Sequence, residues 1–273
     1  MTDFDRVSAY YDVFDEWGRL EAPEGKLEFD MCLPVITGFL PEHAEILDLG
    51  GGPGRYTIAL ARLGYGLRLA DLSQTLLDQA QKRIAELGLT NVKSIAKVNA
   101  TDLSGYEDEA FDAVLVFGPL YHLTGEGERL SCVREVHRVL KKNGLVFASF
   151  IPYLSGGVGI AWRMFHCPDQ ADIGTVERVF SDGVFNNNAN RGFQEAYFPT
   201  SGEIESLFGE NGFAKRLTRS IRGWGSRLEE EIYRLKAENP GAYEDVIALI
   251  NRSAADPSII EMCSHAIYVG EKT

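Results

Sequence analysis

Cysteine is scarce in this chain, and the four cysteines present lie far apart. None pairs at the close spacing of a zinc knuckle or a redox dithiol, so we expect buried free thiols and no metal site. They are Cys32, Cys132, Cys167 and Cys263. Long apolar runs are also missing, since no stretch reaches the length that spans a bilayer. The acidic first residues lack the basic and apolar regions of a signal peptide. We therefore expect a cytoplasmic protein without a membrane partner.

Basic charge is in deficit as well. The chain has 27 Lys and Arg against 40 Asp and Glu, which gives a formal net charge of −13. Such a surface repels phosphate backbones, whereas nucleic-acid-binding proteins usually carry a basic face. The charge therefore argues against a nucleic-acid partner. It leaves the oligomeric state open.

Internal repeats and low-complexity tracts are absent, and a regular alternation takes their place. Short apolar runs alternate with longer amphipathic ones, which is typical of βαβ units and a mainly parallel sheet. The predicted strands are Glu45–Leu49, Leu67–Ala70, Val92–Lys97, Phe111–Phe117, Leu145–Phe150, Phe213–Ile221 and His265–Gly270. The predicted helices that lie between the first five strands in sequence are Gly54–Leu63, Ser73–Leu87 and Glu126–Leu140. The pattern predicts an α/β fold with three layers.

Two segments interrupt this pattern and divide the chain. The parts are an N-terminal arm with a helix (1–44), a core (45–151), a lid segment (152–199) and a C-terminal part (200–273) with a helical insertion at 224–263. The first helix, Lys26–Phe39, contains Pro34, which should kink or divide it. The lid segment is long, follows the fifth strand and is rich in Gly, Asn and eight aromatic residues. That composition predicts a lid over a binding site better than a plain connection.

The most informative motif is the glycine-rich turn Asp48–Gly54, which lies between a predicted strand and a predicted helix. Glycines at positions 50, 52 and 54 permit positive φ angles and let a ligand approach bare backbone. The flanking strand and helix supply the context that a ligand-binding turn requires. Asp48 stands at the end of the strand, where its carboxylate can bind a cationic or amine-bearing ligand. The turn therefore predicts a cofactor site.

A dinucleotide cofactor is the rival interpretation of this turn. The fingerprint G-x-G-x-x-G, begun at Gly50, would need a small residue at position 55. That position holds Arg55, and the third glycine falls at Gly54 instead. The spacing therefore disfavours an NAD(P)-dependent oxidoreductase.

A second acidic residue, Asp71, ends the next predicted strand. An acid at this position can accept both ribose hydroxyls of an adenosine ligand. The alternative is a loop aspartate that interacts with the dipole of the following helix. Because Asp71 comes one βα unit after the glycine turn, the ribose role is favoured.

Taken together, these motifs resemble those of a known family. The pattern Asp48-x-Gly50-x-Gly52-x-Gly54 is followed by Asp71, by Asn99–Leu103 and by Phe111–Leu123. This series resembles the class I S-adenosylmethionine-dependent methyltransferases, most closely the small-molecule enzymes that include the quinone-biosynthesis C-methylating ones. The resemblance is strong from residue 45 to 151 and looser beyond. It implies a Rossmann-like, seven-stranded, mainly parallel sheet with helices on both faces and an antiparallel last strand.

The resemblance also implies which residues hold S-adenosylmethionine. Asp48, Gly50 and Gly52 would hold the methionyl part, and Asp71 the ribose, while Leu72, Asn99 and Ala100 would contact the adenine. The family usually carries aspartate where this chain has Asn99, so Asp102 is an alternative adenine ligand. An N-terminal Tyr-Asp segment folds over the cofactor in similar enzymes, which makes Tyr11 a further cofactor contact.

The fourth strand leads into the expected floor of the site, where Phe117 and Gly118 would also contact the cofactor. In a doubly wound sheet the first and fourth strands flank the switch point at which ligands bind. Tyr121 and His122 follow, and two interpretations stay open for them. Either they position the acceptor or take its proton, or Tyr121 packs under the lid and His122 caps a helix. Methyl transfer needs no strong base, since orientation alone can supply ~7–11 kcal/mol of the barrier.

The sequence thus predicts an S-adenosylmethionine-dependent methyltransferase that acts on a small-molecule acceptor by in-line transfer. The alternative from another class is a non-catalytic S-adenosylmethionine-binding protein. The aromatic lid favours the enzyme, because it indicates a closed and dry acceptor pocket. Neither the acceptor nor the methylated element (O, N or C) follows from these residues.

Overall fold

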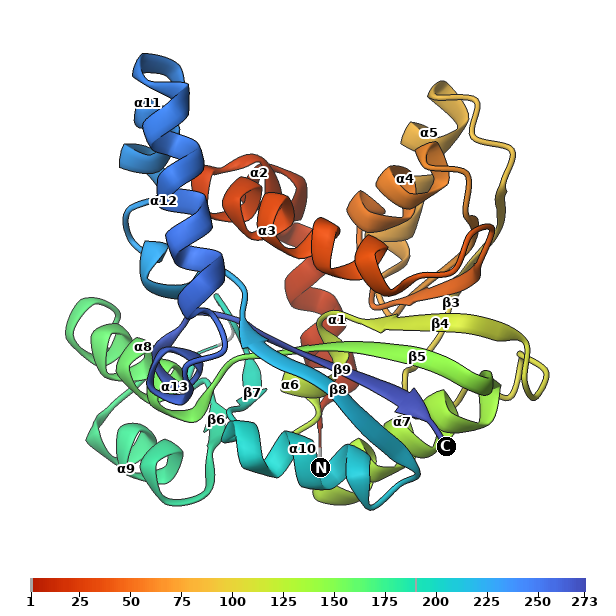
Figure 1. Cartoon of the computed structure of the whole chain (residues 1–273). Coiled ribbons are helices and arrows are strands. Elements are labelled where there is room, and N and C mark those ends of the chain that lie inside the picture. Colours follow the sequence, from red (N-terminus) through yellow and green to blue (C-terminus); the bar gives the residue numbers. More distant parts are fainter. Residues whose placement is uncertain (1, 190) are drawn as a thin grey trace.

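A seven-stranded sheet forms the centre of the computed structural model, which describes residues 2–189 and 191–273 (Figure 1). Its strands are β1 (Glu45–Leu49), β2 (Gly66–Asp71), β3 (Val92–Lys97), β4 (Phe111–Val116), β5 (Leu140–Phe150), β8 (Phe213–Ser220) and β9 (Ala266–Lys272). They follow the order β3-β2-β1-β4-β5-β9-β8. Strand β9 pairs antiparallel with both β5 and β8, whereas the other pairs are parallel. The predicted sheet is confirmed, including its antiparallel last strand.

Helices cover both faces of this sheet (Figure 1). The N-terminal half contributes α1 (Phe4–Val13), α2 (Glu16–Glu21), α3 (Pro23–Phe39), α4 (Arg55–Arg62), α5 (Gln74–Glu86), α6 (Pro119–His122) and α7 (Glu126–Val139). The C-terminal half contributes α8 (Tyr153–His166), α9 (Ile173–Asp182), α10 (Ser201–Gly209), the 3-10 turn η1 (Gly223–Gly225), α11 (Glu229–Glu238), α12 (Pro240–Ser253) and α13 (Pro257–Met262). Residues of α3, α4, α11 and α12 are buried on one face, and those of α7 and α10 on the other.

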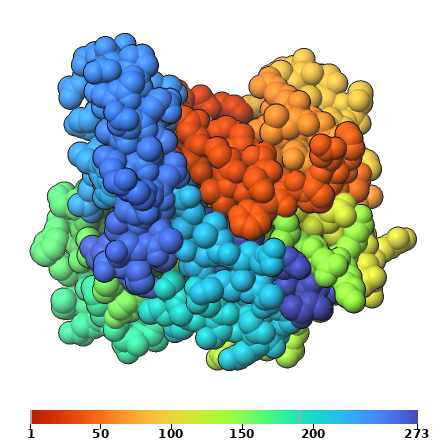
Figure 2. Space-filling model, viewed as in Figure 1, coloured from red at the N-terminus to blue at the C-terminus, as the bar shows by residue number. Residues whose placement is uncertain are grey.

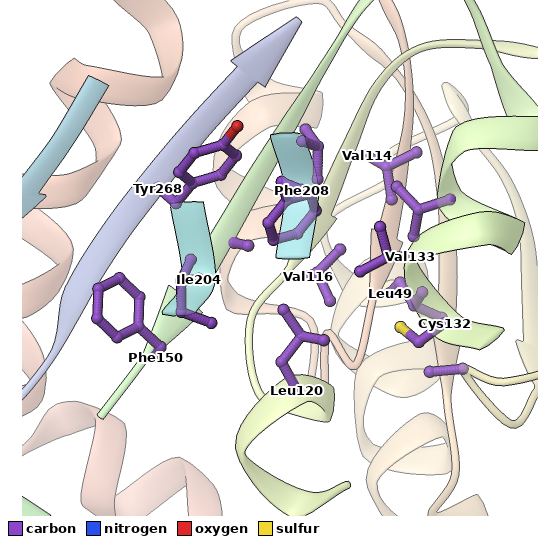
Figure 3. Close-up of a cluster of buried hydrophobic side chains, with 14 of the residues drawn as sticks. Leu49, Val114, Val116, Leu120, Cys132, Val133, Phe150, Ile204, Phe208 and Tyr268 are labelled. Atoms are coloured by element: carbon purple, nitrogen blue, oxygen red, sulfur yellow. The ribbon is translucent and has the colours of Figure 1, made fainter. Parts of the chain in front are cut away.

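The core follows from the alternation of side chains along each strand. Leu47 and Leu49 belong to the cluster under α7 and α10, whereas Ile46, the neighbour of Leu47 along β1, belongs to the cluster under α3. Figure 3 shows part of the first cluster, in which Val116 and Phe208 lie within one apolar group. Because both faces are sealed, the functional residues gather where the strands end, at the carboxyl edge of the sheet.

The structure corrects the predictions at Pro34 and at the start of the fifth strand, and other element ends differ by a few residues. Helix α3 continues through Pro34 without a break, since Met31, Cys32 and Ile36 are buried around it and hold the helix to the sheet. Proline inside a helix removes one backbone hydrogen bond and crowds the preceding turn, and the burial of these neighbours offsets that cost. Strand β5 begins at Leu140 rather than Leu145, because a bulge in its pairing with β4 lets Leu140 lie opposite Phe111.

Two additions extend the sheet and its helices. Residues 152–199 fold into α8, α9 and a small antiparallel hairpin, β6 (Val184–Asn186) with β7 (Glu195–Tyr197). Helices α11 and α12 lie between β8 and β9 in sequence and stand out from the body as a column (blue in Figure 2). Among the described residues, none of the helices combines the length and the apolar character that crossing a bilayer would require.

Candidate functional site

The glycine-rich turn connects β1 to α4 and depends on its glycines. Gly50, Gly52 and Gly54 have φ angles of +76°, +54° and +85°, a region that side-chain-bearing residues rarely adopt. The N–H of Gly50 donates to the Ala70 carbonyl at 2.7 Å, which ties the turn to β2. A Cβ added at Gly50 would lie 2.4 Å from Cδ of Pro119. The turn therefore presents bare backbone directly beneath the end of β4.

Asp48 lies behind this turn and is fully buried. Its Oδ2 accepts from the backbone N–H of Thr57 at 3.0 Å and from the Thr57 hydroxyl at 2.6 Å. Its Oδ1 meets no hydrogen-bond donor in residues 2–189 and 191–273. Burial raises the pKa of Asp48 to about 6, against the opposing effect of the Thr57 bonds. One carboxylate oxygen is thus left to bind a donor in the cavity that Asp48 lines.

Asp71 ends β2 and faces the same cavity. Its Oδ2 accepts from the Gly52 N–H at 2.8 Å, and its Oδ1 accepts from the Ser73 N–H at 2.8 Å. Each carboxylate oxygen can accept a second hydrogen bond, so both keep capacity for ligand hydroxyls. Burial raises the pKa of Asp71, although the two backbone bonds oppose that rise. Asp71 therefore couples the glycine turn to the start of α5 and presents an acceptor pair.

The predicted adenine contacts divide into two groups. Leu72, Asn99 and Ala100 line the cavity beside Asp71. The Asn99 Oδ1 already accepts from the Thr101 N–H at 3.0 Å and from its hydroxyl at 2.9 Å, which leaves the amide NH₂ as the group for a ligand. The prediction for Asp102 needs correction: its side chain is exposed, lies outside this cavity and accepts from the Ser104 N–H. The turn after Asn99 points Asp102 away from the ligand edge.

Gly118 and Tyr121 form the floor between the two ends of the cavity. Gly118 has a φ of +129°, and a Cβ placed there would lie 3.7 Å from the Tyr121 hydroxyl and 3.7 Å from the Gly50 carbonyl. Phe117 lines the same cavity and packs edge-on against Tyr56. Burial raises the pKa of Tyr121, so this hydroxyl stays neutral and can donate a hydrogen bond. The Tyr121 hydroxyl therefore lies over the junction of the first and fourth strands.

His122 is buried and has both ring nitrogens occupied. Its Nδ1 lies 3.1 Å from the Glu195 carbonyl, and its Nε2 lies 2.8 Å from the Tyr11 hydroxyl. A carbonyl can only accept, so Nδ1 carries the proton and Nε2 accepts from Tyr11. Burial lowers the pKa of His122 to about 4. His122 thus joins α1, α6 and β7 as a neutral ring, and Tyr11 reaches the cavity as its partner.

These residues surround one cavity of about 420 Å³, a size typical of small-molecule sites. The structure brings together all predicted site residues except Asp102. One end holds the glycine turn, Asp48 and Asp71. The other end is lined by apolar side chains and by charged residues from several elements. Its apolar members include Phe14, Ile151, Ile160, Phe193 and Phe198.

Several residues of the 152–199 segment line the same cavity as Gly118. Ile160, Phe193 and Phe198 line the cavity, together with Gly156 and Gly159 of α8. The aromatic residues do not all face inward, however. Trp162 is 55% exposed and Phe165 is 75% exposed, on the outer side of α8. Composition alone therefore does not tell which aromatic side chains reach the site.

Two residues that line the cavity were missed in the sequence. Glu28 on α3 and His265, just before β9, both line the cavity, and the carboxylate Oε2 lies 2.8 Å from Nδ1 of the ring. The sequence held a usable signal for His265. An antiparallel last strand begins at the edge where the parallel strands end, so a residue that precedes it lies at the ligand edge. Glu28 gave no such signal.

Comparisons with known proteins agree with this geometry. Residues 46–144 match the family model of a methyltransferase domain. The putative methyltransferase YqeM of Bacillus subtilis is 29% identical over 119 residues, which cover 43% of this chain and 47% of that protein. The ubiquinone/menaquinone biosynthesis C-methyltransferase UbiE of Zymomonas mobilis is 28% identical over 144 residues, 53% of this chain and 56% of that protein. The chain thus spans about half the length of the curated relatives it matches.

A solved structure extends the likeness to the whole fold. The 1,6-didemethyltoxoflavin-N1-methyltransferase of Burkholderia thailandensis, with bound 1,6-didemethyltoxoflavin and S-adenosylhomocysteine, aligns with a TM-score of 0.58 at 17% identity. The alignment covers 98% of this chain and 86% of that one. At such identity the likeness shows the fold and leaves the acceptor of this chain undefined.

Proposed function

We propose that this chain, which belongs to the class I S-adenosylmethionine-dependent methyltransferases, transfers a methyl group from S-adenosylmethionine to a small organic acceptor. The observation that carries the proposal is the single cavity of the carboxyl edge. It joins the glycine turn and Asp71 at one end to an apolar chamber with charged walls at the other. The methyl donor and the methyl acceptor can therefore bind in the same cavity and meet over Gly118.

The residues present fit the cofactor in two respects. Asp48 keeps one buried carboxylate oxygen without a donor in the described chain, and the ammonium of a methionyl group is a donor of the right charge. A Cβ at position 50 would overlap Pro119, so only glycine leaves room for a ligand against the backbone of the turn. S-adenosylmethionine supplies a methyl group on a positively charged sulfur that leaves as a neutral thioether.

Each part of the cavity then has a role in this proposal. The Asp71 carboxylate accepts the ribose hydroxyls, and Leu72, Asn99 and Ala100 bind the adenine. Gly50, Gly52 and Asp48 bind the methionyl end. Tyr121 and Gly118 line the point where the two ligands meet, and Phe117 packs beneath it. Fixing both partners in line supplies ~7–11 kcal/mol of the barrier.

The end of the cavity away from the glycine turn, which we call the acceptor end, fits a small and largely apolar acceptor. Its apolar side chains come from α8 and from residues that directly follow α1 and β5 or flank β7, so they can enclose a ring. The two curated relatives named above carry methyltransferase names, and one of them is a quinone-biosynthesis C-methyltransferase. We propose that residues 152–199 act as a lid that closes this end and excludes water.

Thermal melting tests the cofactor part of the proposal. At a hundredfold excess over its dissociation constant, S-adenosylhomocysteine should stabilise the fold by ~2.7 kcal/mol. In a chain of this size that raises the melting temperature by several degrees, on the order of 5 °C. NADH should have no effect. A shift with NADH and none with S-adenosylhomocysteine would overturn the assignment.

Isotope transfer separates a catalyst from a protein that only binds the cofactor. The protein is incubated with methyl-labelled S-adenosylmethionine and a set of small planar hydroxylated and aminated compounds. We expect label in at least one compound and an equal amount of S-adenosylhomocysteine. Binding of the cofactor without label in any small-molecule fraction would favour the non-catalytic alternative.

A further inference from the structure

The acceptor end of the cavity contains a carboxylate–imidazole pair. Oε2 of Glu28 lies 2.8 Å from Nδ1 of His265, and the two side chains are 20% and 18% exposed. The carboxylate accepts, so Nδ1 carries a proton and directs the other ring nitrogen, Nε2, away from Glu28. Within residues 2–189 and 191–273, no hydrogen-bond partner lies against that Nε2. The His265 ring is also 5.9 Å from the ring of Tyr121, centroid to centroid.

Strand register explains why His265 reaches the site. Ala266, the first residue of β9, lies opposite Phe150, the last residue of β5. His265 therefore stands beside Ile151, just beyond the carboxyl edge of the sheet. Its carbonyl is fixed by the N–H of Ile221 at 2.9 Å and by the Cys263 thiol at 3.0 Å. The backbone under the imidazole is thus held on both sides.

The charges around the pair keep Glu28 ionised. Burial alone would raise its pKa, but His265, Arg222 and Arg19 outweigh that effect and lower the pKa of Glu28 to about 2. Arg222 lies after β8 and is itself paired with the buried Glu229. Arg19 on α2 is paired with Glu16. A carboxylate at Nδ1 fixes the orientation of the ring and of its free Nε2, which is the arrangement of a base held by an acid partner.

We propose that His265 is the general base of the methyl transfer, that Glu28 is its positioning residue, and that the acceptor carries an ionisable hydroxyl or ring N–H. This inference rests on the proposed function. The acceptor's oxygen or nitrogen forms a bond to the methyl carbon, the carbon–sulfur bond breaks with its electron pair on sulfur, and the proton passes to His265 Nε2. The imidazolium then returns the proton to solvent. The other cavity histidine cannot take this role, because Nε2 of His122 is occupied by Tyr11.

A chromogenic phenol tests the base without turnover. The probe is 4-nitrophenol, whose absorbance reports its ionisation, added to the full chain loaded with S-adenosylhomocysteine. In the wild-type protein the pKa of bound 4-nitrophenol should be about one unit or more below that of free 4-nitrophenol, which is a tenfold change in proton affinity. His265→Asn should bind the phenol and lose that shift. An unchanged shift in His265→Asn, or no binding of the phenol, would overturn the proposal.

Turnover adds a second readout once an acceptor is known from isotope transfer. His265→Asn should lower kcat by ~10²-fold or more, with the affinity for S-adenosylhomocysteine unchanged, and should abolish the acidic limb of the pH profile. The limb depends on the groups that face the ring, namely Glu28, Arg222 and Tyr121 with Arg19 behind them. Glu28→Gln should lower kcat less, and Glu28→Asp should restore part of the loss.

His43→Asn is the matched control. His43 is exposed and has a φ of +58°, a conformation that asparagine tolerates, so this variant should behave as wild type in both assays. The outcomes also separate this inference from the proposed function. If S-adenosylhomocysteine does not bind, the proposed function fails. If label is transferred at an unchanged rate by His265→Asn, only the base assignment fails.

Discussion

The two ends of the cavity are built in different ways. At the cofactor end, the turn, Asp48 and Asp71 lie within 24 consecutive residues, and their carboxylates accept mainly from backbone N–H groups of the same stretch. At the acceptor end, Tyr11 meets His122 across 111 positions and Glu28 meets His265 across 237. One end is fixed by local backbone geometry, the other by side chains from separate elements. Substitutions can therefore disturb the two ends separately.

The largest effect should come from the backbone of the cofactor end. Gly50→Ala places a Cβ 2.4 Å from Pro119 at a φ of +76°. The left-handed backbone costs ~1–2 kcal/mol and the overlap ~1–3 kcal/mol, both in the turn that binds the ligand. We expect the affinity for S-adenosylhomocysteine to fall by ~10²-fold or more in calorimetry.

Gly64→Ala provides the control for that variant. Gly64 has a φ of +93° but nothing within 4 Å of an added Cβ, and it lies away from the cavity. It should lose stability through the same backbone strain while it keeps its cofactor affinity. Equal affinity losses in both variants would show that the turn has no special role.

A side chain of the cofactor end should matter somewhat less. Asp71→Ala removes the proposed acceptor of the ribose hydroxyls, and hydrogen bonds to charged groups are worth about 1.5–3 kcal/mol. The affinity for S-adenosylhomocysteine should fall by roughly tenfold to a hundredfold while the protein stays folded. Asp102→Ala should bind normally, because its carboxylate is exposed outside the cavity. Normal binding by Asp71→Ala would remove the ribose assignment.

Asp48→Asn tests whether the buried charge at the cofactor end lowers the stability of the fold. Its folded pKa of about 6 lies above the unfolded value of 3.8, so the charged form is penalised in the fold. The penalty is absent below pH 4, grows between pH 4 and pH 6, and reaches up to about 3 kcal/mol above that. Asp48→Asn should therefore raise the melting temperature by several degrees at pH 8 and little at pH 4. Equal shifts at both pH values would contradict the buried charge.

The smallest effect is expected from His122, at the acceptor end. His122→Asn removes contacts that join α1, α6 and β7 but leaves the proposed base in place. We expect turnover to fall by less than about tenfold, with cofactor affinity unchanged, since loss of a true general base costs ~10²–10⁴. A loss of that larger size, with the acidic limb of the pH profile gone, would transfer the base role from His265 to His122.

That the residues of the cofactor end lie together could be predicted from the sequence, because the evidence for it is local. Strand, glycine turn and helix follow one another directly, so Asp48, Gly50 and Asp71 could be placed without knowledge of the fold. Asp102 was misplaced because two residues separate it from Asn99, and the turn between them reverses its direction. Spacing alone does not reveal on which side of a loop a carboxylate lies.

The acceptor end was harder to predict because its residues meet only in the folded chain. Glu28 on an ordinary amphipathic helix gives no local signal, and its partner becomes visible only through the register of β9 against β5. Trp162 and Phe165 show the limit of composition as evidence. They are aromatic residues in the right segment, yet they lie on its outer surface. Helix periodicity tells which residues share a face, but not which face meets the cavity.

A crystal structure with S-adenosylhomocysteine bound would test the central claim most directly. The account predicts the ribose hydroxyls on the Asp71 carboxylate, the adenine beside Leu72 and Ala100, and the amine at Oδ1 of Asp48. The sulfur should face Gly118 and the Tyr121 hydroxyl, with open space toward His265. Density that places the ligand outside this cavity, or that reverses it so that the adenine lies at Glu28 and His265, would contradict the account.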